Sequence, residues 1–413
     1  MPGPGPHRPL IDVRQGAAEL DAADPLRACR ALFIQHPDVV AYLDGNSLGR
    51  PLVATRDRMR RFVDEAWAGR LIRAWDEEWM DFPTQVGDTI GRVVLGAAPG
   101  QTVVADSTTV VLYKLARAAV AARPGRREVV VDEENFPTDR FVVEGMAAEL
   151  GLTVRRISPD QFGGVTEDQV RGAVGAQTAL VLLSHVAYKS GYIADMPAIT
   201  AAVHEGGALV LWDVSHSVGA IDVQLDAADA DLAVGCTYKY LNGGPGSPAF
   251  GYVAQRLHGL ARQPIQGWMG AADPFGMTDS YEPARGIRQF ISGTPPILGM
   301  LPMLDMLELI DRVGIAQIRR KSLLLTQFVF DYCGAHLAPL GVTVATPRED
   351  GFRGGHVTLE HPNAREMTAQ LWKQGVIPDF RPPSGMRIGL SPLSTSFAEL
   401  GDGLEAIRGL CES

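Results

Sequence analysis

Residues 208–216 read ALVLWDVSH, an unbroken apolar run that ends at Asp213 and is followed shortly by His216. A strand that is apolar at every position is buried on both faces, which is typical of a parallel sheet covered by helices. Similar runs, most of them followed by a helical pattern, occur at TVVAD (102–106), EVVVDE (128–133) and TALVLLSHV (178–186). The sequence therefore predicts an α/β domain with a mostly parallel central sheet.

The pattern along the chain divides it into three segments. An N-terminal arm and segment (1–50) begins with the Pro/Gly-rich MPGPGPHRPLID, for which we expect a loose conformation. The large α/β domain spans 51–300. A smaller α+β domain spans 301–413, where one long helical stretch (301–336) precedes short strands.

Composition and charge narrow the classes of partner. Of 413 residues, 38 are Lys or Arg and 48 are Asp or Glu, a net charge of −10, and no basic patch is evident. We therefore expect neither a nucleic-acid nor a membrane partner, and no apolar run is long enough to span a bilayer. The four cysteines are widely spaced, which points to a reducing cytoplasm, and no Cys/His cluster predicts a metal. A small-molecule substrate is the expected partner.

Hydroxyl residues follow one of the predicted strands. Ser107, Thr108 and Thr109 come directly after TVVAD and open a helical pattern. Free N–H groups, the positive end of a helix dipole and hydroxyl donors together suit an anion, naturally a phosphate. A plain Ser/Thr helix cap is the alternative explanation.

A second constellation links Asp213 with a lysine further along the chain. Asp213 ends a buried strand, where ligands bind in open α/β sheets, and Lys239 lies before a Gly/Pro-rich turn. A carboxylate that keeps a ring nitrogen protonated and an amine that condenses with an aldehyde together indicate pyridoxal 5'-phosphate. An ion pair and a solvated lysine are the alternative.

Other residues suggest how a substrate is held. Arg387, at the start of a short strand in the small domain, can bind a carboxylate with two hydrogen bonds. Phe136, Trp75 and Trp268 are candidates for stacking on a cofactor or an aromatic substrate, although aromatic residues usually belong to a core.

Two rival motifs are rejected. Gly45-Asn46-Ser47-Leu48-Gly49 matches the G-x-S-x-G nucleophile elbow of serine hydrolases, but it comes too early in the chain, before the strands of a hydrolase sheet. We expect instead a turn whose glycines let the backbone approach a ligand, with Asn46 as a donor. In GGPGSPA (243–249) the prolines prevent the helix start that a dinucleotide site needs.

A series of stretches, in order from about residue 40 to 397, together resembles a known family. They are YLDGNSLGRP, LIRAW, DSTTVVLYK, NFPTDRF, DVSHSVGAI, YKYLNGGPGSPAF, QGWMG, SGTPPIL and MRIGLSPL. The set resembles bacterial kynureninase, a family of fold-type I pyridoxal-phosphate enzymes. LDGNSLG and YKYLNGGPG distinguish it from cysteine desulfurases and aminotransferases, which share the Asp and Lys pair.

The resemblance implies a role for each matching residue. Lys239 would form the Schiff base with the cofactor, Asp213 would pair with its ring nitrogen, and Tyr238 would join them as a catalytic residue. Further cofactor contacts are implied for Ser107, Thr108, Phe136, Asp139, Ser184, His216, Tyr238, Trp268 and Thr294. Trp268 and Thr294 would reach the site of the neighbouring subunit of a homodimer. Substrate contacts are implied for Arg387, Trp75, Asn46 and Ser47.

The resemblance also implies the reaction. A kynureninase hydrolyses L-kynurenine to anthranilate and L-alanine by cleaving the Cβ–Cγ bond, and 3-hydroxykynurenine would give 3-hydroxyanthranilate. Trp75 stands where animal members that favour the hydroxylated substrate have a histidine, which favours kynurenine itself. Thr294 replaces an asparagine of those members, so their contacts with the ring hydroxyl are not carried over. Lys239 and Tyr238 are both candidates for activating the water.

Three alternatives stay open. One is a kynureninase-like hydrolase that acts on a ring-substituted kynurenine in a biosynthetic pathway. Another is a non-catalytic protein that binds the cofactor, although such a protein has no need to keep Lys239, Asp213 and Arg387 together. A serine hydrolase that uses Ser47 ranks last.

Overall fold

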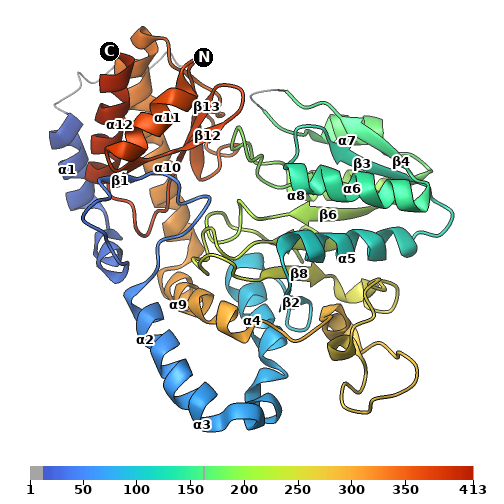
Figure 1. Ribbon diagram of the computed structural model, residues 1–413. Coiled ribbons are helices and arrows are strands. Elements are labelled where there is room, and N and C mark those ends of the chain that lie inside the picture. The colour runs from blue at the N-terminus through green and yellow to red at the C-terminus, as the bar shows by residue number, and fades with distance from the viewer. Residues whose placement is uncertain (1–12, 161–162, 413) are drawn as a thin grey trace.

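The central element is a seven-stranded sheet in the computed structural model, which describes residues 13–160 and 163–412 (Figure 1). Its strands are β2 (Thr102–Ala105), β3 (Glu128–Asp132), β4 (Thr153–Ile157), β5 (Thr178–Ser184), β6 (Leu209–Asp213), β7 (Leu232–Gly235) and β8 (Ala249–Val253). Their order is β2-β8-β7-β6-β5-β3-β4. Strands β3 to β7 pair in parallel, and β8 is antiparallel to both of its neighbours. The sheet is therefore mostly parallel, as predicted.

Helices cover both faces of this sheet. On one face, α5 (Thr108–Ala121) and α6 (Pro137–Leu150) pack on alternate strand residues such as Leu209 and Leu211. On the other face, α4 (Phe82–Ile90), α8 (Met196–Glu205) and α9 (Ile297–Val313) pack on Val210 and Trp212. Every residue of β6 is buried, which is why its sequence shows no alternation. The predicted α/β class is confirmed.

A smaller α+β unit follows the large sheet. Its antiparallel sheet has the order β12-β13-β10-β9, formed by β9 (Thr343–Val344), β10 (His356–Glu360), β12 (Asp379–Arg381) and β13 (Gly385–Gly389). Helices α10 (Ile315–Tyr332), α11 (Ala364–Lys373) and α12 (Phe397–Cys411) share its core. The start of the chain joins this unit, because α1 (Val13–Ala23) packs on α12 and β1 (Ala41–Tyr42) pairs with β11 (Val376–Ile377) (Figure 1).

Two helical predictions have different outcomes in the structure. The long helical stretch expected over 301–336 is helical but divided, because Gly314 adopts a φ of 84° and separates α9 from α10. For residues 51–69, where Pro51 and Gly69 predict the start and end of one amphipathic helix, the chain is helical through α2 (Val53–Arg61), a π-helical turn (Phe62–Trp67) and α3 (Ala68–Arg70). The loose arm expected at residues 1–12 lies outside the described residues.

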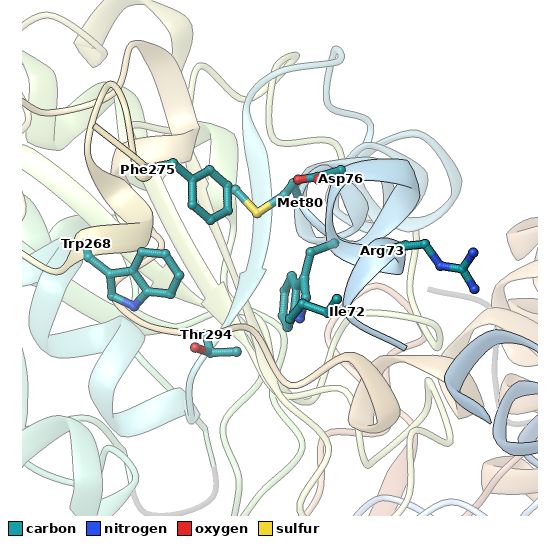
Figure 2. A pocket seen from close by; sticks show the side chains of 8 residues that line it. Ile72, Arg73, Asp76, Met80, Trp268, Phe275 and Thr294 are labelled. Atoms are coloured by element: carbon teal, nitrogen blue, oxygen red, sulfur yellow. The ribbon is translucent and has the colours of Figure 1, made fainter. Parts of the chain in front are cut away.

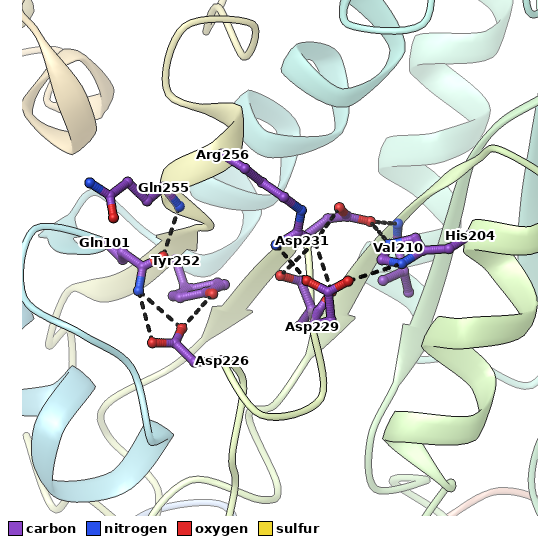
Figure 3. A network of polar contacts seen from close by, with 10 residues as sticks. Gln101, His204, Val210, Asp226, Asp229, Asp231, Tyr252, Gln255 and Arg256 are labelled. Atoms are coloured by element: carbon purple, nitrogen blue, oxygen red, sulfur yellow. Dashed lines mark hydrogen bonds and ion pairs between the residues drawn. The ribbon is translucent and has the colours of Figure 1, made fainter.

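A polar network secures the sheet at the edge opposite the carboxyl ends of its parallel strands (Figure 3). Asp231, just before β7, accepts hydrogen bonds from the backbone N of Val210 and from Nη2 of Arg256, both at 2.8 Å. The Nε2 atom of His204 in α8 lies 2.9 Å from the same side chain, which is buried. The network ties α8, β6 and β7 together and leaves the other edge of the sheet free for a site.

Candidate active site

A cavity of about 180 Å³ lies at the carboxyl ends of the parallel strands, between the large sheet and the small unit. We refer to it as the Lys239 cavity. Among the residues that line it are many of those predicted from the sequence: Ser47, Thr108, Phe136, Asp139, Ser184, Asp213, His216, Tyr238, Lys239 and Arg387. Segments that are far apart in the sequence thus meet at one place, as the rule for open α/β sheets predicts.

Lys239 is held by a neighbouring histidine. Its Nζ atom lies 2.9 Å from Nε2 of His216 and 6.0 Å from the ring centroid of Phe136. Burial, followed by the positive charges of Lys239 and Arg387, lowers the pKa of His216 well below its ordinary value. A neutral His216 can accept a hydrogen bond from the amine without adding a second positive charge beside it.

Two carboxyl groups reach the cavity from different elements. Asp213 is the last residue of β6, and its Oδ1 accepts a 2.7 Å hydrogen bond from the backbone N of Ser215. Asp139, in the first turn of α6, is buried, and its Oδ2 has no hydrogen-bond partner. Burial, and then the charge of Asp213, raises the pKa of Asp139 well above its ordinary value. The environment of Asp139 therefore favours the neutral form of its carboxyl group.

The N-terminus of α5 does not use its hydroxyl for capping. Ser107 occupies the N-cap position, but its side chain makes no capping hydrogen bond. Thr108 begins the helix and lines the cavity with Thr109. The plain helix cap, which was the alternative explanation for these hydroxyls, is thus not what the structure shows. The hydroxyl and N–H groups are available to an anion.

Arg387 lies in the middle of β13 and is almost completely buried. Its Nη1 donates to the carbonyl O of Tyr188 at 2.9 Å, and its Nη2 donates to Oγ of Ser47 at 2.8 Å. The same Nη2 lies 2.5 Å from Oδ2 of Asp379 and 3.9 Å from Oδ1 of Asp44. Burial, and then the charge of Asp379, raises the pKa of Asp44 to about 6. The guanidinium is thus fixed in position at the cavity wall.

The turn that contains Ser47 bridges the two parts of the molecule. The backbone N of Gly49 donates to the carbonyl O of Tyr238 at 2.8 Å, and a Cβ on Gly49 would stand 2.5 Å from the carbonyl O of Lys239. Asn46 is buried, and its Oδ1 would stand 1.7 Å from a Cβ on Gly389. The backbone of this turn was expected to approach a ligand closely, but it packs closely against other parts of the chain instead. The contact of Asn46 with a substrate stays a prediction.

The sequence reasoning missed several residues at the cavity. Tyr188 follows β5 and packs edge-on against Phe136, with ring centroids 5.4 Å apart. Arg381 lies in β12, with Nε 2.7 Å from Oδ2 of Asp379. Tyr188 could have been found, because it follows a buried strand as the other site residues do. Arg381 could not, because its place depends on how the small sheet docks.

Three predicted residues lie in a different pocket. Trp75, Trp268 and Thr294 line a cavity of about 340 Å³ together with Ile72, Arg73, Asp76, Met80 and Phe275 (Figure 2). We refer to it as the Trp268 pocket. Within the described part of the chain it shares no lining residue with the Lys239 cavity. The predicted site residues of one chain thus fall into two separate groups.

The residues of the Lys239 cavity fit pyridoxal 5'-phosphate. An amine, a strand-end carboxylate, the ring of Phe136 and the open N-terminus of α5 all face one space. The buried, unpartnered Oδ2 of Asp139 offers a further polar contact to a bound group. In residues 13–160 and 163–412, no group of three His, Cys, Asp or Glu side chains could hold a metal. No helix in these ranges is long and apolar enough to cross a membrane.

Comparisons with known proteins agree with this geometry. Residues 76–347 match the aminotransferase class-V family, and residues 318–407 match the kynureninase C-terminal domain. The chain is 40% identical to the kynureninase of Pseudomonas fluorescens over 404 residues, 96% of this chain and 95% of that protein. It is 38% identical to the kynureninase of Burkholderia pseudomallei strain K96243 over 408 residues, 98% of this chain and 96% of that protein.

Solved structures share the fold. The apo cysteine desulfurase from Thermococcus onnurineus NA1 superposes with a TM-score of 0.79 at 18% identity, and covers 91% of this chain and 95% of that one. The cysteine desulfurase CsdA from Escherichia coli gives a TM-score of 0.79 at 15% identity, with 94% and 98% covered.

Proposed function

The chain belongs to the kynureninase family, and from this premise we propose how its residues perform the reaction. It is a pyridoxal-phosphate-dependent hydrolase that acts on carbon–carbon bonds in ketonic substrates and converts L-kynurenine to anthranilate and L-alanine. This reaction belongs to the kynurenine pathway of tryptophan catabolism. A hydrolase dedicated to ring-substituted kynurenines in a biosynthetic pathway is not favoured by these relatives.

One observation carries the assignment to the Lys239 cavity. The amine of Lys239 and the carboxylate of Asp213 reach the same cavity from two different connections, with Phe136 beside the amine. When bound there, pyridoxal 5'-phosphate supplies an electron-accepting ring that stabilises negative charge at the substrate Cα. Asp213 would pair with the ring nitrogen, and the hydroxyls of Ser107 and Thr108 would hold the phosphate.

Lys239 moves the proton at the substrate Cα. Its Nζ is held by Nε2 of His216, a neutral acceptor, at 2.9 Å. As an amine it takes the Cα proton, and the polar contacts of the cavity keep it directed at that atom. Ser184, whose Oγ donates to Oδ1 of Asn135 at 2.6 Å, completes the wall next to Asp139.

The water that attacks the γ-carbonyl needs a base. Burial, and then the nearby Cys236, raises the pKa of Tyr238 above its ordinary value, so the phenol keeps its proton at neutral pH. Tyr238 is therefore suited to donate a hydrogen bond to the γ-carbonyl oxygen. Lys239 is the better candidate for the base, once it has given the Cα proton back to the bound substrate and cofactor and is again a free amine. Addition of water then allows the Cβ–Cγ bond to break.

Arg387 binds the substrate carboxylate. Burial and its bonds to Ser47 and Tyr188 fix the guanidinium at the wall of the cavity before substrate arrives. Planar guanidinium groups hold carboxylates with good geometry, and a fixed one loses little entropy on binding. Ser47 therefore acts as an acceptor that orients Arg387.

The enzyme works as a homodimer in this proposal. The support is that Trp75, Trp268 and Thr294 lie in the Trp268 pocket rather than in the Lys239 cavity. Several apolar side chains at or near that pocket are strongly exposed, among them Leu71 (58%), Ile72 (77%), Phe275 (54%) and Met277 (76%). A patch of this kind marks an interface. A second copy would bring the Trp268 pocket of one subunit to the Lys239 cavity of the other.

We further propose a cytoplasmic location and a preference for unsubstituted kynurenine. All four cysteines are free thiols, as expected in a reducing compartment. The preference rests on Trp75 and Thr294, which present an indole and a short hydroxyl side chain in the same pocket.

The proposal is tested with the purified enzyme, its cofactor and L-kynurenine. We expect fluorescent anthranilate and L-alanine in equal amounts, and loss of both in Lys239→Ala. The exposed Lys373 in α11 provides a matched control, because Lys373→Ala removes a lysine that lines neither pocket. Absence of both products from the wild type with cofactor bound would refute the assignment, and a panel of substituted kynurenines would then identify the substrate.

A further inference from the structure

Lys114 is a buried cation that the reaction described above does not use. It lies in the apolar face of α5, where Leu112, Leu115 and Ala118 pack on the sheet, and it is 1% exposed. Burial lowers its pKa. Burying a charge costs free energy unless the charge is paired, so the partners of Lys114 indicate which parts of the chain it positions.

The first partner is Asp106, whose carboxylate forms an ion pair with Nζ of Lys114. Asp106 has a φ of 47°, in the left-handed region that few residues other than glycine, asparagine and aspartate adopt. Its carbonyl O accepts a 2.9 Å hydrogen bond from the backbone N of Ala249. The residue is thus fixed at both its backbone and its side chain. Ser107 and Thr108 follow it directly.

The second partner lies on another segment. Nζ of Lys114 donates to the carbonyl O of Phe290 at 2.7 Å. Phe290 ends a 3₁₀ helix (Gly286–Phe290), and the chain then runs within four residues to Thr294 in the Trp268 pocket. One ammonium group therefore joins the turn before α5 to the segment that leads to the Trp268 pocket.

We propose that Lys114 is a positioning residue for the cofactor phosphate. By holding Asp106 and the carbonyl of Phe290, it sets the place of Ser107 and Thr108 in its own site and of Thr294 for the partner subunit. The proposal rests on the assignment of the phosphate to the N-terminus of α5. It predicts that Lys114 acts on the phosphate end of the cofactor and not on its ring.

A second buried lysine offers a matched control. Nζ of Lys321, in α10 of the small unit, lies 2.7 Å from Oδ2 of Asp24, and both side chains are buried. Neither residue lines the Lys239 cavity or the Trp268 pocket. If Lys114 served only the stability of the fold, Lys114→Met and Lys321→Met would change the affinity for the cofactor to the same extent.

The experiment titrates the cofactor-free proteins with pyridoxal 5'-phosphate and, separately, with pyridoxal, which lacks the phosphate. We expect Lys114→Met to raise the Kd for pyridoxal 5'-phosphate about tenfold, the effect of misplacing one hydrogen bond to the charged phosphate. We expect the Kd of Lys114→Met for pyridoxal to stay within about twofold of the wild-type value. The Kd values of Lys321→Met for pyridoxal 5'-phosphate and for pyridoxal should stay within the same range.

Asp106→Asn is the second test, because asparagine adopts the left-handed conformation as readily as aspartate but carries no charge. It should reproduce the loss for pyridoxal 5'-phosphate, and it decides the question if Lys114→Met does not fold. An unchanged Kd for pyridoxal 5'-phosphate in a folded variant, or an equal loss for pyridoxal, would overturn the proposal. Neither titration involves kynurenine, so this outcome is separate from the test of the reaction.

Discussion

Arg387 donates a 2.8 Å hydrogen bond from Nη2 to Oγ of Ser47, although 340 positions separate the two residues in the sequence. This bond joins β13 to the turn Gly45–Gly49 and gives Ser47 a role as acceptor in place of the nucleophile that its motif suggests. The glycines of the turn serve close packing against Ser391 and Asn242. The motif is thus an element of substrate recognition in this proposal.

Ser47→Ala tests that role. Arg387 would lose one of its fixing contacts and bind the substrate carboxylate less well, so we expect KM to rise about two- to tenfold. We expect kcat to change little, because the contact does not alter between the ground state and the transition state. Steady-state kinetics with L-kynurenine provides both values. Complete loss of turnover in a variant that still binds cofactor would instead indicate a serine nucleophile.

Asp139→Asn and Asp213→Asn form a contrasting pair. Burial and the charge of Asp213 raise the pKa of Asp139 and favour its neutral form, so we expect an amide of the same shape to change kcat/KM by less than about threefold. In the proposed site Asp213 would supply the charge beside the ring nitrogen, so its replacement should lower kcat/KM by on the order of 100-fold or more. Equal losses of kcat/KM in the two variants would contradict this division of roles between Asp139 and Asp213.

Mixing of inactive subunits tests the homodimer. Lys239→Ala removes the amine from the Lys239 cavity, and Trp268→Ala removes an aromatic wall from the Trp268 pocket. If each site combines both parts from different subunits, random reassociation of the two variants restores about a quarter of the wild-type activity, because half of the dimers have one intact site. If the mixture is no more active than the sum of the activities of the two variants measured separately, Trp268 does not belong to the partner's site.

The network at the far edge of the sheet predicts a pH-dependent stability. The hydrogen bond to Asp231, and then the nearby charges, raises the pKa of His204 above its ordinary value. The folded state therefore favours protonated His204, so its contribution is complete below the unfolded pKa and is lost as the pH rises through the folded pKa.

We expect His204→Gln to lower the free energy of unfolding by about 0.5–1 kcal/mol at pH 5.5 and by less at pH 9, allowing for solvent screening. Urea denaturation at the two pH values measures the difference. A larger effect at pH 9 than at pH 5.5 would contradict the assignment.

The large sheet could be predicted where its strands are buried on both faces. The strands β5 and β6 have uninterrupted apolar sequences, and the structure buries almost all of their residues. The edge strand β4, with the sequence TVRRI, was missed because its arginines are exposed. A break at Gly314 was also missed, because a single glycine does not reveal its φ angle in a sequence.

The candidate site could be predicted where its residues follow strands. Asp213 ends a strand of the parallel sheet, and Thr108 starts the helix after one. Ser184 also ends a strand, but only the resemblance implied its role. Arg381 and Asp379 depend on the docking of a three-residue strand, for which the sequence offers no pattern. The separation of Trp75 from Lys239 is likewise a property of the fold, which places the two residues in different pockets.

The central claim is that the amine of Lys239 holds the cofactor. Reduction of the wild-type enzyme with borohydride in the presence of pyridoxal 5'-phosphate, followed by peptide mapping, measures this directly. We predict a single labelled peptide, which contains Lys239, in the wild type and no label in Lys239→Ala. A label on another lysine, or none on a protein that still forms anthranilate, would contradict it.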